Sequence, residues 1–154
     1  MATYQARPHQ TDPAGHHDDR YYTEAETYAL ISAGGVVAVH FVVDGGGSAI
    51  TTGIKGDVLI PFAATITKWT LLPDVSGSVV FDLWKSTYAN YPPTVANTIP
   101  AAAKPTISGA TKAQSTTLTG WTTAVAADDI IRVSIDSATT ITRCALVLRL
   151  TRTI

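Results

Sequence analysis

The chain has 154 residues and a formal net charge of −1 at pH 7, and 45% of its residues are hydrophobic while only 15% are charged. This length suits one compact domain with a short appendage. No run of Lys and Arg exceeds two residues, so we expect binding neither to nucleic acid nor to an anionic membrane surface.

Residues 1–20 form a polar leader that contains Pro8, Pro13 and Gly15 and cannot bury a core of its own. Such a segment stays extended until it docks on another protein, so we predict a docking arm here. The first residues lack the apolar core of a signal peptide. No stretch of the chain approaches the roughly 20 apolar residues of a membrane helix, and we expect no membrane insertion.

The arm ends in a cluster of potential metal ligands, His16, His17, Asp18 and Asp19. Imidazole and carboxylate groups suit zinc or nickel, particularly where copies of a chain converge on an axis. The spacing, however, has no zinc-site signature. We therefore interpret the cluster as a solvated docking segment and predict no metal and no cofactor.

Residues 21–35 predict a short helical neck. Thr23 and Glu26 fit a capping box, in which the hydroxyl and the carboxylate each satisfy a backbone N–H group. A rough apolar stripe follows, and Gly34 and Gly35 provide the end of the helix. About three turns are too few to be stable alone in water, so the helix needs partners. Those partners are either the rest of the chain or further copies of the helix around an axis.

Residues 36–154 predict an all-β domain. The run 36–43 is continuously apolar and ends at a glycine-rich turn that starts with Asp44. Further strands are predicted at 57–62, 64–72, 78–84, 130–136 and 140–151, with a weak or edge strand at 107–118 and a short strand at 120–125. Eight or so short strands of period 2, with turns between them, indicate an antiparallel β-sandwich or jelly roll.

Alternation within these strands predicts which side chains form the core. We expect four groups of side chains each to share one face of a strand: Val79, Phe81 and Leu83; Ile131, Val133 and Ile135; Cys144, Leu146, Leu148 and Leu150; and Thr65, Thr67, Trp69 and Leu71, opposite Ile66, Lys68 and Thr70. Cys144, the only cysteine, cannot form an internal disulfide and is interpreted as a buried apolar side chain. His40 is interpreted as a core or interface histidine.

Residues 85–105 form a long irregular segment with four prolines, and ordered loops of this length are often functional. Tyr88 and Tyr91 lie on it, with Trp84 at its start, and Trp121 lies further along the chain. Aromatic rings on a rigid loop can stack on sugars or anchor a protein partner. Alternatively, they pack the loop onto the sandwich or line a subunit interface. We retain these four residues as receptor or interface candidates.

The acidic residues do not indicate catalysis. General acid–base chemistry needs paired carboxylates in tuned environments, whereas most aspartates of the β domain fall at strand ends or turns. Asp82 is the exception, since it lies within a strand beside Trp84. After His40 the chain has no histidine, and we therefore predict no enzyme.

The segment HDDRYYTEAE at residues 17–26 resembles a segment that is common in phage tail-fibre and related virion proteins. There it links an attachment or shaft region to the next domain, usually in a trimer. The resemblance implies roles in virion docking and in the neck for His17, Asp18, Asp19, Arg20, Tyr21, Tyr22, Thr23 and Glu26.

A second resemblance covers roughly residues 41–151, through the pieces FVVDGGGSAITTGIKGDVLIPF, ITKWTLLPDVSGSVVFDLWK, YPPT, GWTT and DDIIRVSIDSATTITR. These are similar to a β domain that is frequent in phage structural proteins. The likeness implies a virion location, a fibre or spike context and a homotrimer, and it transfers no catalytic residues.

The two lines of reasoning together predict a non-enzymatic virion subunit that is assembled in the host cytoplasm. The arm would bind other virion proteins, the neck would be a three-helix stem, and the β domain would be the head, with host-receptor adhesion as an additional role. A carbohydrate-binding module that holds host surface glycan is one alternative. A capsid decoration or head-fibre protein is another.

Overall fold

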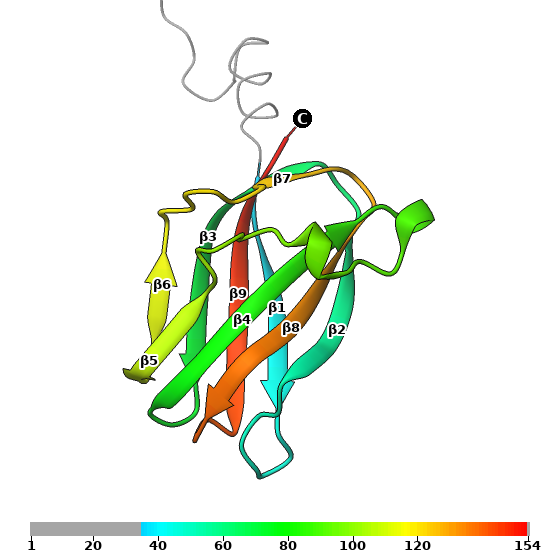
Figure 1. Ribbon diagram of the computed structural model, residues 1–154. Helices are drawn as coiled ribbons and strands as arrows, with labels where there is room; N and C mark the ends of the chain where they lie inside the picture. Colours follow the sequence, from blue (N-terminus) through cyan, green and yellow to red (C-terminus); the bar gives the residue numbers. More distant parts are fainter. Residues whose placement is uncertain (1–34, 154) are drawn as a thin grey trace, which may run out of the picture. The chain divides into compact units, whose positions relative to one another are not determined.

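The computed structural model of this chain describes residues 35–153, which belong to one compact unit (Figure 1). The predicted arm (1–20) and the predicted helical neck, with every candidate docking residue they contain, lie outside the described residues. No helix in the described part is long and apolar enough to cross a lipid bilayer.

The described residues form two antiparallel sheets that pack face to face, so the predicted all-β sandwich is confirmed. Sheet A contains, in spatial order, β1 (Val36–Asp44), β9 (Arg143–Arg152), β3 (Ala64–Pro73) and β6 (Ala113–Ser115), with β7 (Ala124–Val125) also paired to β3. Sheet B contains β2 (Gly53–Ile60), β8 (Asp129–Thr139), β4 (Gly77–Ser86) and β5 (Thr106–Ala110). This double four-strand order is that of a jelly roll.

Alternation explains most of the core, because successive side chains of a strand point to opposite faces. The side chains predicted to face inward on β4, β8 and β9 are buried between the sheets: Val79, Phe81, Leu83, Ile131, Val133, Ile135, Cys144, Leu146, Leu148 and Leu150. Cys144 is therefore confirmed as a buried apolar side chain.

The predicted face of β3 is wrong, because the strand contains a β-bulge between Ile66 and Lys68. Thr67 is the extra residue, and its hydroxyl donates a hydrogen bond to the carbonyl of Arg149 at 3.2 Å. The bulge lets Ile66 and Trp69 both point into the core, although they lie three residues apart. Strict alternation would have turned one of these two large side chains toward solvent.

Three further expectations need correction. Residues 107–118 form two short edge strands, β5 and β6, which belong to different sheets. Of the strand predicted at 120–125, only Ala124–Val125 pairs in a sheet. His40 is not in the core, because β1 is an edge strand and His40 lies on its exposed face. The interface alternative for His40 stays a prediction.

The ends of the sandwich carry different loops. β1 begins, β4 ends and β9 ends at the end that is uppermost in Figure 1, where the long segment after β4 also lies. The opposite end carries the tight connections 44–53, 73–77, 110–113 and 139–143. The predicted functional loop is therefore at the end where the chain enters the sandwich.

Candidate functional site

Residues 87–105 cross the outer face of sheet B, and we call this segment the strap. It contains two 3-10 turns, η1 (Tyr88–Asn90) and η2 (Val95–Asn97). Polar contacts fasten it to β2, to β8 and to β4 in turn, so it runs across three strands before it joins β5. Figure 1 shows η1 beside β2 and η2 in front of β4 and β8.

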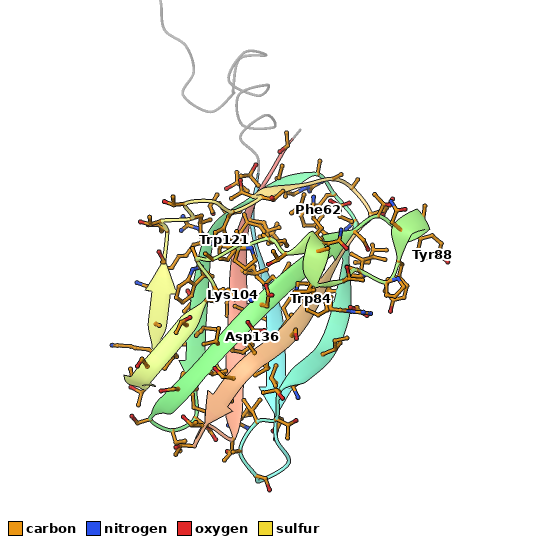
Figure 2. The ribbon with its side chains drawn as sticks, viewed as in Figure 1. Phe62, Trp84, Tyr88, Lys104, Trp121 and Asp136 are labelled. Carbon is orange, nitrogen blue, oxygen red and sulfur yellow. The ribbon has the colours of Figure 1, made fainter. Side chains whose placement is uncertain are left out.

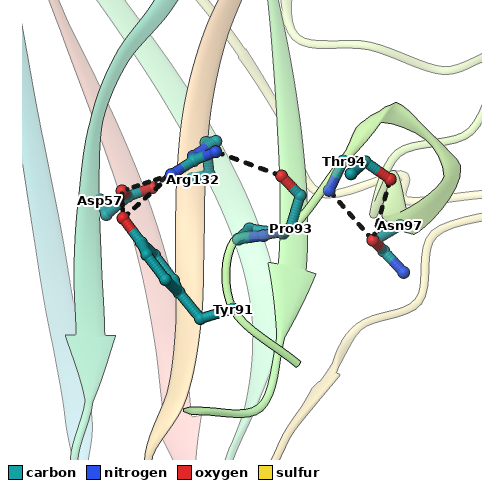
Figure 3. Close-up of polar contacts among 6 residues, drawn as sticks. All are labelled: Asp57, Tyr91, Pro93, Thr94, Asn97 and Arg132. Carbon is teal, nitrogen blue, oxygen red and sulfur yellow. Dashed lines mark hydrogen bonds and ion pairs between the residues drawn. The ribbon is translucent and has the colours of Figure 1, made fainter. Parts of the chain in front are cut away.

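The first fastening is a cluster around Arg132, which we call the outer clamp (Figure 3). Register places Asp57 of β2 opposite Arg132 of β8. Arg132 Nε lies 2.7 Å from Asp57 Oδ1 and Nη2 lies 2.8 Å from Oδ2, which is a bidentate pair. Tyr91 Oη donates to Asp57 Oδ2 at 2.8 Å, and Arg132 Nη1 donates to the Pro93 carbonyl at 3.3 Å. One guanidinium thus links two strands to the strap.

The outer clamp is ionised on both sides. Hydrogen bonds from Arg132 lower the pKa of Asp57, partial burial opposes them, and the Tyr91 hydroxyl adds to the lowering. Asp57 in turn raises the pKa of Arg132. The guanidinium also lies 5.3 Å from the centroid of the Tyr91 ring, a distance at which a cation attracts an aromatic face. The Tyr91 side chain is therefore held both through its hydroxyl and through the face of its ring.

The second fastening, the inner clamp, surrounds the fully buried carboxylate of Asp82. Figure 2 labels two of the other residues of this clamp, Lys104 and Asp136. Asp82 Oδ2 lies 2.9 Å from Lys104 Nζ, and Thr98 Oγ1 donates to Asp82 Oδ1 at 2.7 Å. Lys104 also reaches Asp136 Oδ2 at 2.6 Å. Burial raises the pKa of Asp82, but the contacts with Lys104, Thr98 and the Trp84 indole outweigh it, so this pKa is lowered.

The strap also packs on the core. The backbone N–H of Ile99, a buried residue, donates to the Leu83 carbonyl at 2.7 Å, and Thr98 forms a β-bridge with Trp84. The indole N–H of Trp121 donates to the Ala103 carbonyl at 2.9 Å. A loop of this length is thus held along most of its course, by backbone contacts as well as by charged side chains.

The four aromatic candidates separate into two pairs. Trp121 is buried in the core, and Trp84 is half-buried with its indole N–H shielded from solvent. Tyr91 is 48% exposed and Tyr88 is 79% exposed. The tryptophans therefore support the strap from beneath, and the tyrosines belong to its surface.

Polar groups on the strap fix its outer turn. Asn97 Oδ1 accepts hydrogen bonds from the backbone N–H of Thr94 at 3.0 Å and from its hydroxyl at 3.3 Å. These bonds close η2, on which Val95 is 63% exposed. The exposed surface of the strap therefore combines aromatic, aliphatic and polar side chains on a fastened backbone, which is suited to recognition.

The ionisable groups of each clamp form ion pairs with one another. A general acid at neutral pH needs a raised pKa, whereas the pKa values of Asp57 and Asp82 are lowered. Between residues 35 and 153 no group of three His, Cys, Asp or Glu side chains is arranged to hold a metal ion. The predicted cluster His16–Asp19 lies outside these residues.

Sequence reasoning missed Asp57, Arg132 and Lys104. Asp57 and Arg132 are 75 positions apart, and their pairing depends on the register of two strands that are not consecutive in the chain. One signal was present: Arg132 lies in the middle of a strand between Ile131 and Val133, on the face opposite to the core. A charge there needs a partner or solvent.

No protein-family model, no curated protein and no solved structure matches the chain. Its function is therefore inferred from its residues and their geometry.

Proposed function

We propose that the chain is a non-enzymatic structural protein of a bacteriophage particle and forms the subunit of a trimeric fibre or spike. One observation carries this proposal: the HDDRYYTEAE segment at 17–26 is followed, only ten residues later, by a β-sandwich that starts at Val36. A shaft-linking segment directly before a β head is the order expected of a virus appendage. In this proposal residues 1–20 bind other virion proteins and residues 21–35 form the neck.

The construction of the sandwich supports a structural role. The longest loop is fastened at both clamps, and Cys144 is buried, so the head depends on no disulfide. The charged groups of both clamps are engaged in ion pairs. The strap therefore offers a surface for recognition and not groups for acid–base chemistry.

Deleting residues 1–20 tests the docking role. The truncated protein is expected to remain a folded trimer in solution and to be missing from purified particles, because residues between Val43 and Leu150 supply the described core. Particle mass spectrometry and native mass of the truncated protein measure the two results. Incorporation of the truncated chain at the normal level would show that the docking assignment is wrong.

The exposed tyrosines favour a second role, adhesion to a host surface glycan. Aromatic faces stack on sugar rings, and Tyr88 projects from η1 with most of its ring in solvent (Figure 2). A glycan array should show binding by the native protein that Tyr88→Ala abolishes. Val75→Ala, at an exposed position at the opposite end of the sandwich, is the control. No binding of the native protein to any host glycan would leave the structural role alone.

A further inference from the structure

The β-bulge in β3 places two consecutive side chains on the outer face of sheet A. Ile66 and Trp69, one on each side of the bulge, both point into the core, so Thr67 and Lys68 between them both point outward. In a regular strand one of these two side chains would face the core. Bulges often re-aim side chains beside functional sites. This bulge brings a hydroxyl and an ammonium group together on one outer surface.

Lys68 lies next to a second cation. It is in register with Arg149 of β9, the strand that pairs with β3 (Figure 1). Directly opposed side chains of a sheet lie close together, and like charges at such positions are destabilising. Neither of the two forms an ion pair with a residue between 35 and 153, whereas the cations of both clamps do. The described part of the chain therefore holds two positive charges together without an acidic partner.

The acidic residue of sheet A lies far from this pair. Asp44 is the one acidic residue in the described strands of the sheet. It lies opposite Arg143 at the end of β1, about 20 Å along the strand from the position opposite Arg149. Its carboxylate also accepts a hydrogen bond from the backbone N–H of Gly46. The surface around Lys68 and Arg149 is therefore positively charged and attracts anions.

Thr67 fixes the side chain of Arg149. Arg149 Nε donates to Thr67 Oγ1 at 3.3 Å, and the Thr67 hydroxyl donates to the Arg149 carbonyl at 3.2 Å. These bonds hold the guanidinium beside the strand that carries Lys68. Its two terminal nitrogens, Nη1 and Nη2, donate no hydrogen bond to the described residues, so they remain available. A side chain that is already held in place loses less conformational freedom when it binds a ligand.

We propose that Lys68 and Arg149 bind a phosphate monoester group on the outer face of sheet A. The guanidinium donates in parallel to two oxygens of such a group, and the ammonium reaches another. A phosphate monoester carries a charge of about −1.5 to −2 at pH 7, which matches two cations. A nucleic acid, in contrast, requires a longer row of cations, because it is bound through many phosphates. The site lies on the sheet opposite to the strap, so this inference is independent of the proposed function.

Polar side chains around the pair can contact a molecule that carries the phosphate. Thr65 and Thr151 lie in register with each other beyond Lys68 and Arg149, and His40 of β1 lies diagonally from Arg149. Hydroxyl and imidazole groups can form hydrogen bonds with the hydroxyl groups of a saccharide. Free phosphate and a phosphorylated saccharide share the chemistry that the two cations recognise, and binding measurements with both distinguish them.

Phosphorus NMR spectroscopy with inorganic phosphate tests the site in the full-length protein. The native protein should broaden the phosphate signal saturably at constant ionic strength. Lys68→Gln and Arg149→Gln should each weaken the binding about ten-fold, because each removes a charge-assisted contact. Arg143→Gln is the matched control. It removes the same charge from the same face of β9, opposite Asp44, and should change the binding by about two-fold or less.

Two results of this titration would overturn the site. One is a native protein that has no saturable effect on the phosphate signal. The other is equal weakening by all three substitutions, since phosphate would then respond to the overall charge alone. Thermal unfolding gives an independent measurement, in which phosphate should raise the unfolding temperature of the native protein and of Arg143→Gln but not that of Arg149→Gln.

Glucose 6-phosphate and glucose, measured by their displacement of inorganic phosphate, identify the source of the phosphate group. Tighter binding of glucose 6-phosphate than of inorganic phosphate supports a phosphorylated saccharide as the ligand. Equal or weaker binding of glucose 6-phosphate supports free phosphate. Glucose that displaces phosphate as well as glucose 6-phosphate does would show that the phosphate group is not what the site recognises, and the proposal would be wrong.

Discussion

Arg132 contributes to the strap through the shape of its guanidinium as well as through its charge. It uses two nitrogens on Asp57 and a third on the Pro93 carbonyl. Arg132→Lys keeps the charge but cannot make the bidentate pair. We expect faster amide hydrogen exchange across residues 88–98 and a loss on the order of 1 kcal/mol in the free energy of unfolding.

The control for this substitution is Arg143→Lys, at an exposed position where β9 begins. Its exchange pattern in the strap should match that of the native protein. If Arg132→Lys leaves strap exchange unchanged, the inner clamp and the backbone contacts suffice to hold the segment, and the outer clamp has another role.

Asp74 gives the protein a pH dependence at the end opposite to the strap. Its carboxylate accepts hydrogen bonds from the Thr142 hydroxyl and from the backbone N–H groups of Thr142, Arg143 and Val75. The Thr142 hydroxyl and the Arg143 amide are the main causes that lower its pKa from 3.8 to about 2. A lowered folded-state pKa stabilises the protein above the unfolded-state pKa, and this stabilisation is lost as the pH falls toward 2.

The corresponding prediction concerns Asp74→Asn. The native protein should be more stable than this variant at pH 5, and the difference should shrink steadily between about pH 4 and pH 2. Urea unfolding followed by circular dichroism at each pH measures it. Asp128→Asn, at an exposed turn position with positive φ that asparagine tolerates, is the control. A difference that stays constant with pH would mean that folding does not lower the pKa of Asp74.

The burial of some residues could be predicted from the sequence, whereas the partners of others could not. The inward faces of β8 and β9 follow from alternation alone. On β8, however, alternation does not identify all buried residues, because Ile130, Arg132 and Ser134 on the outer face are buried as well. The partner of Arg132 could not be predicted, because it depends on strand order and register. Tyr88 and Tyr91 were identified by their place on a proline-rich loop, but their different exposure depends on the contact with Asp57, far away in the sequence.

Among the elements, β3 shows what local pattern reasoning misses. The residue pattern of its segment is consistent with a regular strand, but the bulge at Thr67 adds one residue and resets the alternation. The division of residues 107–118 into β5 and β6 was also missed. Thr111 and Lys112 send the chain from one sheet to the other, and Gly109, which has a positive φ just before the crossing, was the available signal.

Deleting single residues of β3 tests the bulge. Removing Thr67 should convert it into a regular ladder in which Ile66 and Trp69 still face inward, at a cost of about 1 kcal/mol for the lost bond to Arg149. Removing Thr70 should instead turn Trp69 or Leu71 out of the core and cost about 3 kcal/mol or more. Thermal unfolding of the two variants compares them. Equal destabilisation by both deletions would contradict the assignment of Thr67 as the extra residue.

At the scale of the whole molecule, the two sheets form one core. Labelling of the only cysteine measures how often this core opens. Cys144 is fully buried on β9, and burial raises the pKa of its thiol to about 11. A maleimide therefore reacts with it only when the sandwich opens. For a domain of ordinary stability, labelling should be about a thousand-fold or more slower than in the unfolded chain.

The dependence of this rate on stability distinguishes global from local opening. Leu148→Ala removes a fully buried side chain from the same strand, which should cost about 3 kcal/mol and accelerate labelling of Cys144 about a hundred-fold. Val95→Ala on the strap should leave the rate unchanged, since that side chain is exposed and is not part of the buried core. If Leu148→Ala destabilised the protein in urea without accelerating the labelling, β9 would be opening locally, and the two sheets would not unfold as a single cooperative unit.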